Sequence, residues 1–238
     1  MSTAPVPSRW HIPPAAIAIH LCVGSVYAWS VFNKPIEALQ PAFPKGAAAY
    51  TFSIAIALLG LSAAFGGRWL ERTGPRRAAT LAALCFGGGM LLAAWGVARG
   101  TLALLYLGYG VIGGVGLGLA YISPVSALVK WFPDRRGMAT GMAVLGFGGG
   151  SLIAAPLMNA LIARHGVPTA LATLGLAYGA IMLVAARGLA VPPTGWLPAG
   201  FDPARRPAAV RPLLGDLAVG DAIRTREFAL LWVMLFVK

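Results

Sequence analysis

Residues 66–77, GGRWLERTGPRR, place five charges within twelve positions, between two long stretches that carry none. The apolar stretches on its two sides, near 50–69 and 78–98, are each close to the roughly 20 apolar residues that a helix needs to cross a lipid bilayer. Gly74 and Pro75 favour a tight turn at this point. A charged turn between two such helices indicates a protein that crosses the membrane several times.

The composition of the whole chain agrees with this interpretation. Of its 238 residues, 58% are hydrophobic and 11% are charged, against about 25% charged in a typical soluble domain. The formal net charge of +12 does not indicate nucleic-acid binding, because the basic residues lie between apolar stretches and not along one soluble face. Cys22 and Cys85 lie inside apolar stretches and are interpreted as small buried hydrophobic residues, not as a disulfide framework. The expected environment is therefore the lipid bilayer.

Six apolar stretches are long enough to cross a bilayer. They lie near 14–32, 50–69, 78–98, 102–123, 138–163 and 169–188. All seven acidic residues fall outside these stretches, as expected because an ionised side chain in the membrane core is costly. The first stretch lacks the small-residue cleavage site of a secretory signal peptide, so we interpret it as an anchor. The sequence predicts an all-α integral membrane protein.

The basic residues predict the orientation of this six-helix unit. With the N-terminus in the cytoplasm, the segments on the cytoplasmic side hold 14 lysine and arginine residues, and the loops on the other side hold four. This is a strong positive-inside bias. We therefore expect residues 1–13 to be a cytoplasmic N-terminus and residues 14–188 to be six transmembrane helices in the cell (inner or plasma) membrane.

The chain changes character after residue 188. Residues 189–227 are rich in Pro, Gly and Arg and predict a flexible cytoplasmic linker. Residues 228–238, FALLWVMLFVK, form a seventh apolar stretch, about half as long as a bilayer span. We therefore expect a truncated chain, whose missing helices would follow this segment.

Glycines recur every four residues in the fourth span and around the fifth. They are Gly110, Gly114 and Gly118, then Gly137 and Gly141, and Gly146 and Gly150. Small residues at this spacing let helix backbones approach closely in lipid. The pattern fits close packing, and it fits equally well a contact along which helices slide.

The charged turn resembles the signature loop G-x-L-x-D-R-x-G-R-R of the major facilitator superfamily. The matching residues are Gly67, Arg72, Gly74 and Arg76, while Glu71 replaces the usual Asp, Trp69 replaces Leu and Pro75 replaces an Arg. WFPDRRGMATGM (131–142) is similar to the family's turn between helices four and five. Three further stretches are RWHIPPAA (9–16), GSVYAWSVFNKP (24–35) and RTREFALLWVMLF (224–236). Together with the two turns, they resemble the oxalate/formate antiporter branch of the superfamily.

The resemblance implies a fold of twelve helices in two six-helix halves, joined by a long cytoplasmic loop. This chain would be the N-terminal half plus the start of helix seven, and its partner would be the missing C-terminal half. The implied activity is secondary active transport of a small organic anion by alternating access, with no cofactor and no metal. The implied cytoplasmic gate, which holds the halves together while the carrier faces outward, comprises Gly67, Glu71, Arg72, Gly74 and Arg76. Glu71 is expected to pair with the arginines around it, or these charges to cap the adjacent helix ends.

The substrate pocket of such folds lies near the middle of the membrane, between the halves. His20 and Tyr27 share one face of the first span, and the resemblance implies that Tyr27 and Tyr121 line the pocket. Trp29 lies two residues after Tyr27 but points elsewhere on the helix. His20 is the one ionisable side chain well inside a span, which makes it a functional candidate, although a neutral histidine can equally hydrogen-bond within a bundle. The candidate pocket residues are therefore His20, Tyr27, Trp29 and Tyr121.

Two absences bear on the coupling. No carboxylate lies inside the six spans, and the region near Gly110 lacks the arginine that many proton-coupled relatives carry. Exchange or facilitated transport of an organic anion is therefore favoured over proton-driven export. The resemblance places the anion-binding cations in the C-terminal half. Val26 replaces a pocket glutamine of the oxalate carrier, which leaves other small mono- or dicarboxylates open as substrates.

Other functions are less compatible with the sequence. An enzyme would need a nucleophile and a base, or a metal cluster, at membrane depth, but His11 and His165 lie near loops and no acid is placed to orient His20. GYGVIG (108–113) fits a dinucleotide motif, yet it lies inside an apolar span and not in a βαβ unit. A membrane sensor or assembly subunit of the same fold, without transport, stays an open alternative.

Overall fold

The computed structural model describes residues 8–202 and 219–236, and all regular structure in these residues is helical. The chain divides into two units, Met1–Pro198 and Ala199–Lys238. Five helices of the first unit are long and apolar enough to cross a membrane. The prediction of an all-α membrane protein is therefore confirmed.

The first crossing is one continuous helical run, Arg9–Leu39. It consists of η1 (Arg9–His11), α1 (Ile12–Gly24), η2 (Ser25–Phe32) and α2 (Asn33–Leu39). Pro13 lies in the first turn of α1, where its missing N–H costs no hydrogen bond. The eight residues of η2 form a tighter 3-10 helix, which is unusually long for this conformation and lies in the middle of the span.

The second and third crossings are α3 (Ala47–Thr73) and α4 (Pro75–Arg99). Gly74 alone separates them, with φ 85° and ψ 158°, a conformation that residues with a Cβ rarely adopt. Pro75 then occupies the first position of α4, where its fixed φ favours a helix start. The predicted turn at Gly74 and Pro75 is confirmed.

The fourth crossing runs from Leu102 to Trp131. It begins with α5 (Leu102–Leu105), widens into a π-helical segment, η3 (Tyr106–Gly113), and continues as α6 (Gly114–Trp131). Pro124 lies inside α6 and cannot donate a hydrogen bond to the carbonyl of Ala120, four residues earlier.

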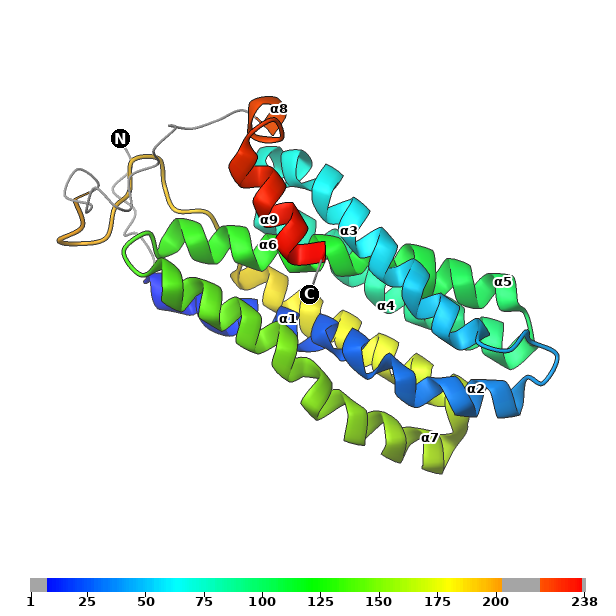
Figure 1. Cartoon of the computed structure of the whole chain (residues 1–238). Coiled ribbons are helices and arrows are strands. Elements are labelled where there is room, and N and C mark those ends of the chain that lie inside the picture. The colour runs from blue at the N-terminus through cyan, green and yellow to red at the C-terminus, as the bar shows by residue number, and fades with distance from the viewer. Residues whose placement is uncertain (1–7, 203–218, 237–238) are drawn as a thin grey trace. The chain divides into compact units, whose positions relative to one another are not determined.

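The last long helix, α7 (Arg136–Gly188), has 53 residues, about 80 Å if it were straight. It is not one rod, because Gly166 has φ 76° and ψ 170° and divides it into two helical arms. Figure 1 shows the second arm turning back toward the end at which the first arm begins. The break lies between the predicted spans 138–163 and 169–188, so each of the six predicted spans corresponds to a helix.

The helices of the first unit pack through glycines. Within it, α7 packs against α1 and α4, while α6 packs against α3 and α4. A Cβ atom at Gly118 would overlap Ser62 and the Leu59 carbonyl on α3, and one at Gly24 would overlap the Phe147 carbonyl on α7. Of the predicted glycine repeats, Gly114, Gly118, Gly146 and Gly150 make such close approaches, and a Cβ at Gly110 would lie 3.0 Å from Ile54, whereas Gly137 and Gly141 face open space.

The packed unit continues past the end of α7. Leu189 is buried, the indole N–H of Trp131 donates a hydrogen bond to the Ala190 carbonyl at 2.8 Å, and the ring of Trp196 lies 4.8 Å from that of Trp131. Residues 189–198, expected to begin a flexible linker, are thus held against the helical unit by two tryptophans.

The second unit contains α8 (Val219–Ala222) and α9 (Arg226–Phe236) in its described part. The apolar stretch predicted from residue 228 onward is helical as far as Phe236, and the hydroxyl of Thr225 accepts the N–H of Phe228 in the first turn of α9. The middle of the predicted linker, 203–218, and the last two residues lie outside the described residues.

We expect Gly24→Ala to destabilise the protein, because the new methyl group would meet a backbone carbonyl that cannot rotate away. Overpacking of this kind typically costs about 1–3 kcal/mol, and the melting temperature of the detergent-solubilised protein should fall by several degrees. Gly148→Ala is the matched control, since a Cβ there meets nothing within 4 Å. Equal melting temperatures for the two variants would contradict the close contact of α1 with α7.

Candidate functional site

Four aromatic side chains from three helices meet in the middle of the first unit. His20 and Tyr27 come from the first crossing, Tyr121 from α6 and Phe147 from α7. The Phe147 ring lies 5.2 Å from Tyr27, 5.0 Å from Tyr121 and 6.2 Å from His20, each time edge to face. This arrangement is favourable for aromatic rings. These four residues are called the Phe147 cluster.

The local backbone explains why the cluster forms. Gly24 ends α1 and lies against the Phe147 carbonyl, so α7 approaches the first crossing closely at this level. Tyr27 follows in the 3-10 segment, one turn further along. Phe147 therefore reaches both Tyr27 and Tyr121.

The cluster has a buried side and an open side. His20 is fully buried, whereas Tyr27 is 54% exposed and Tyr121 is 36% exposed. Each tyrosine hydroxyl can donate one hydrogen bond, and the rings around them are apolar. A small ligand with a carboxylate and a short carbon skeleton could use both properties.

His20 connects the first crossing to α6. Its Nε2 lies 3.1 Å from the carbonyl oxygen of Tyr121, and because a carbonyl only accepts, this nitrogen carries the hydrogen. The accepting carbonyl is adjacent to that of Ala120, which Pro124 leaves without its usual helical partner. His20 thus orients the backbone that carries Tyr121.

Trp29 lies elsewhere in the first unit. It is 1% exposed, its indole N–H donates to the Ala48 carbonyl at 2.7 Å, and its ring stacks on Tyr109 at 3.9 Å. The structure therefore brings together His20, Tyr27 and Tyr121 of the four candidate pocket residues, but not Trp29. Val26 is also fully buried.

Glu71 in the charged turn has a different partner from the one expected. The Lys130 ammonium on α6 lies 2.6 Å from Glu71 Oε2, and the Ser126 hydroxyl donates to Oε1 at 3.2 Å. The flanking arginines make no ion pair with it: Arg68 and Arg72 are exposed on α3, and Arg76 and Arg77 follow the turn on α4. The difference arises because Glu71 lies on the face of α3 that packs against α6.

A pocket of about 470 Å³ links the charged turn to the aromatic cluster. Its lining includes Gly67 and Glu71 on α3, and Tyr121, Ser126 and Lys130 on α6. Tyr121 and Lys130 are nine residues apart, which is about 13 Å along a helix. The pocket between α3 and α6 thus contains both Tyr121 of the cluster and the Glu71–Lys130 pair.

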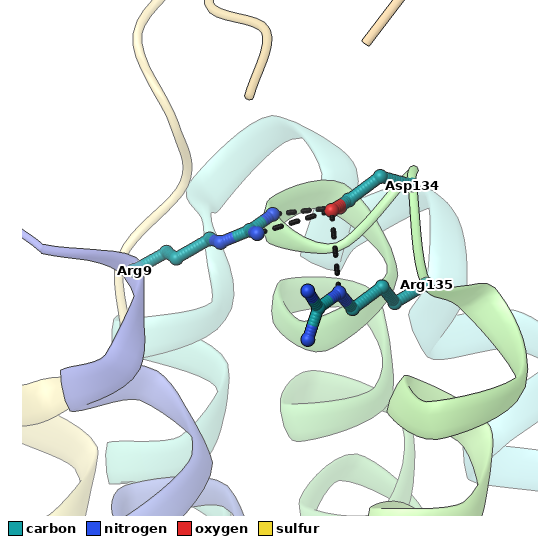
Figure 2. A network of polar contacts seen from close by, with 3 residues as sticks. All are labelled: Arg9, Asp134 and Arg135. Atoms are coloured by element: carbon teal, nitrogen blue, oxygen red, sulfur yellow. Dashed lines mark hydrogen bonds and ion pairs between the residues drawn. The ribbon is translucent and has the colours of Figure 1, made fainter. Parts of the chain in front are cut away.

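A second ion pair lies at the same end of the first unit (Figure 2). Arg9 contacts both carboxylate oxygens of Asp134, at 2.6 and 3.0 Å, and its guanidinium lies 4.8 Å from the Phe132 ring centroid. Arg135 Nε is 3.7 Å from Asp134. The hydrogen bonds from Arg9, and to a lesser extent the charges of Arg9 and Arg135, hold the pKa of Asp134 below its ordinary value.

Several site residues were not predicted from the sequence. Phe147 is the only aromatic residue in the stretch 138–163, a signal that could have singled it out. Lys130 and the Arg9–Asp134 pair carried no comparable signal, because their partners are 59 and 125 residues away. Among the described residues, no three His, Cys, Asp or Glu side chains gather as a metal site would require.

Comparison with known proteins gives consistent results. A family model described as Major Facilitator Superfamily matches residues 16–237. The oxalate:formate antiporter of Oxalobacter formigenes is 28% identical over 99% of this chain and 53% of its own length. Apicoplast pyruvate carrier 1 of Toxoplasma gondii is 29% identical over 61% of this chain and 33% of its own. The chain thus spans about half, or less, of these relatives.

A solved structure supports the fold. The crystal structure of a D-xylose-proton symporter superposes with a TM-score of 0.58 over 77% of this chain and 49% of that one, at 20% sequence identity. The expected architecture, a six-helix N-terminal half of this fold, is confirmed.

We expect Asp134→Asn to lower the melting temperature by about 3 °C, the equivalent of roughly 1 kcal/mol in a chain of this size. A carboxyl group whose pKa is lowered by folding stabilises the fold above the ordinary pKa of Asp, about 3.9, and loses this effect as the pH falls through the folded value. The difference from wild type should therefore be constant from pH 7 to pH 5, begin to shrink below about pH 4, and disappear once the pH falls below the lowered pKa of the folded state.

Thermal unfolding of the detergent-solubilised chain across this pH range measures the effect. Arg135→Gln is the control, because the longer contact of 3.7 Å should contribute less. A wild-type advantage that stays the same from pH 5 down to pH 2 would show that the stabilisation does not come from the ionised carboxylate.

Proposed function

Because this chain belongs to the Major Facilitator Superfamily, we propose that the complete gene product is a secondary transporter that exchanges or translocates small organic anions, such as mono- or dicarboxylates, by alternating access. The family consists of multi-pass membrane proteins. The named activities of two relatives, an oxalate:formate antiporter and a pyruvate carrier, concern carboxylates. The family membership supports transport, and the site supports this class of substrate.

The observation that carries the proposal is the open side of the Phe147 cluster. Tyr27 and Tyr121 present two hydroxyl donors beside an aromatic ring, in the middle of the helices that cross the membrane. In the described part of residues 9–188, the carboxylates Glu37, Glu71 and Asp134 all lie near helix ends. An anion at the cluster would therefore meet no repelling charge from this unit.

The cation that balances the anion is proposed to come from a C-terminal six-helix half. Inside the crossings of this unit the ionisable candidate is His20, which is buried behind Tyr121. Lys130 lies at the end of the α3–α6 pocket and is already paired with Glu71. A second half that contributes one or two basic side chains opposite Tyr27 would complete the pocket.

We assign the cytoplasmic gate to the charged turn, with the division of roles that the contacts suggest. Glu71 and Lys130 hold α3 and α6 together at this end, so that both helices move as one body. Arg72 and Arg76, exposed and without an ion pair among the described residues, are free to contact the other half. Gly67 keeps the pocket beside Glu71 open, since nothing lies within 4 Å of where its Cβ would be.

Tracer exchange in proteoliposomes of the complete gene product tests the function. Vesicles loaded with unlabelled oxalate, formate, pyruvate or succinate should take up the same labelled anion faster than empty vesicles. If no carboxylate is exchanged against any counter-anion by folded, correctly inserted protein, the proposal fails and a non-transporting role of the same fold is left.

In the same assay, Tyr27→Ala should weaken the apparent affinity for the transported carboxylate about tenfold or more, because a hydrogen bond to a charged group contributes roughly 1.5–3 kcal/mol. Tyr27→Phe separates the hydroxyl from the ring: an affinity loss similar to that of the alanine variant points to the hydroxyl. Tyr50→Ala, an equally exposed tyrosine on α3, is the control. An unchanged affinity in Tyr27→Ala would place this residue outside the pocket.

Glu71→Gln should slow transport severalfold without lowering the amount of protein in the membrane, since it leaves Lys130 unpaired at the gate. Lys130→Gln should do the same, and the double variant should be no slower than either single one, because directly contacting residues are not additive. Rates are compared at matched expression. Wild-type rates for Glu71→Gln, or strictly multiplicative losses in the double variant, would contradict the gate role of this pair.

A further inference from the structure

One face of α4 is exposed and largely apolar, as expected of a helix surface that contacts lipid. Its exposed residues include Arg77, Leu81, Leu84, Leu91 and Trp95, at spacings of three, four and seven that place them along one stripe. The opposite face, with the buried Phe86 and Met90 among others, packs against α6 and α7. The stripe is therefore the side of α4 that this unit leaves uncovered.

The two ends of the stripe match the thickness of a bilayer. Arg77 and Arg99 are 22 residues apart, about 33 Å along a helix, and a hydrocarbon core is about 30 Å thick. Arg99 lies 5.9 Å from the ring of Trp95, and tryptophan is enriched at the membrane interface. Arg77 then lies at headgroup level on the other side, which the positive-inside pattern assigns to the cytoplasm.

A pocket lies at the Arg77 end of this stripe. It has a volume of about 450 Å³ and is lined by Arg76, Arg77, Thr80, Leu81 and Leu84. It is separate from the Glu71–Lys130 pocket and shares no residue with it. Within the described residues, neither arginine forms an ion pair, whereas Arg9 and Lys130 at the same end do. Two free guanidinium groups thus stand above an apolar wall.

We propose that this pocket binds the headgroup of an acidic phospholipid. The lipid phosphate is held by Arg76 and Arg77, and the first acyl segments lie against Leu81 and Leu84. Guanidinium groups suit phosphate because they donate two parallel hydrogen bonds, and basic pockets at the cytoplasmic ends of membrane helices are typical of such sites. The apolar wall favours a lipid over free phosphate, which would gain nothing from the leucines.

This inference does not depend on which anion is transported. It gives Arg77 a role apart from the gate, and it gives Arg76, which the proposed gate includes, a second contact. Glu71 faces α6 across the α3–α6 pocket, while Arg76 and Arg77 line the pocket on the uncovered side of α4. The one turn then serves two surfaces, and a bound lipid would hold the start of α4 at a fixed depth.

Native mass spectrometry of the delipidated 238-residue chain tests the proposal. The chain is titrated with phosphatidylglycerol, with phosphatidylcholine and with inorganic phosphate, and bound states are counted at each concentration. We expect phosphatidylglycerol to bind wild type about tenfold more tightly than phosphatidylcholine, and the double variant Arg76→Gln/Arg77→Gln to lose this preference, because each basic residue near an acidic lipid surface contributes roughly a fivefold gain. Arg68→Gln/Arg72→Gln removes the same charge from the end of α3 and should change binding less than about twofold.

The remaining outcomes are equally decisive. Leu84→Asn alters the apolar wall of the pocket without changing its charge. It should weaken the binding of phosphatidylglycerol severalfold and leave the binding of phosphate unaffected. This variant tests the proposal even if the arginine variants misfold. Equal losses in the two double variants would show that only total charge matters and would overturn the site. Displacement of the lipid by an equal concentration of inorganic phosphate would assign the pocket to a free anion instead.

Discussion

The contact of Gly24 with the Phe147 carbonyl is the constraint on which the arrangement of the candidate site depends. Helices in lipid gain no hydrophobic driving force from meeting one another, so close van der Waals packing at small residues must hold them together. Here the backbones of the first crossing and of α7 touch directly, with Gly146 and Gly150 on either side of the contact. The aromatic ring of Phe147 is thereby placed between two tyrosines from other helices.

Unusual helix types also lie beside close glycine contacts. After Gly24 the first crossing tightens into a 3-10 helix, and in the fourth crossing the π-helical segment carries Gly108, which would meet the backbone of α4 if it had a side chain. Such segments often occur at functional sites and hinges. In this unit such segments lie where glycines let two helix backbones meet.

Two ion pairs lie at the end of the first unit that contains Arg9. Each ion pair ties helices that are distant in sequence: Lys130 and Glu71 join α6 to α3, and Asp134 joins the turn before α7 to the start of the first crossing. Both pairs are partly exposed, so each contributes modestly to stability. Their effect is to fix the ends of helices whose apolar middles pack largely through glycines and aromatic rings.

The sequence by itself determined the class of protein, the six crossings, the turn at Gly74 and the break near Gly166, because hydrocarbon admits only long apolar helices and the chain can reverse only where glycine or proline allows it. It also identified Tyr27, Tyr121 and His20 as residues of one region, through helical spacing and a family resemblance. Tertiary structure alone decided which of them is buried, that Trp29 packs on Tyr109, that Phe147 lies between the tyrosines, and that Glu71 pairs with Lys130. These outcomes depend on the rotation of each helix about its axis, which is set by packing between residues far apart in the chain and leaves no periodic trace in the sequence.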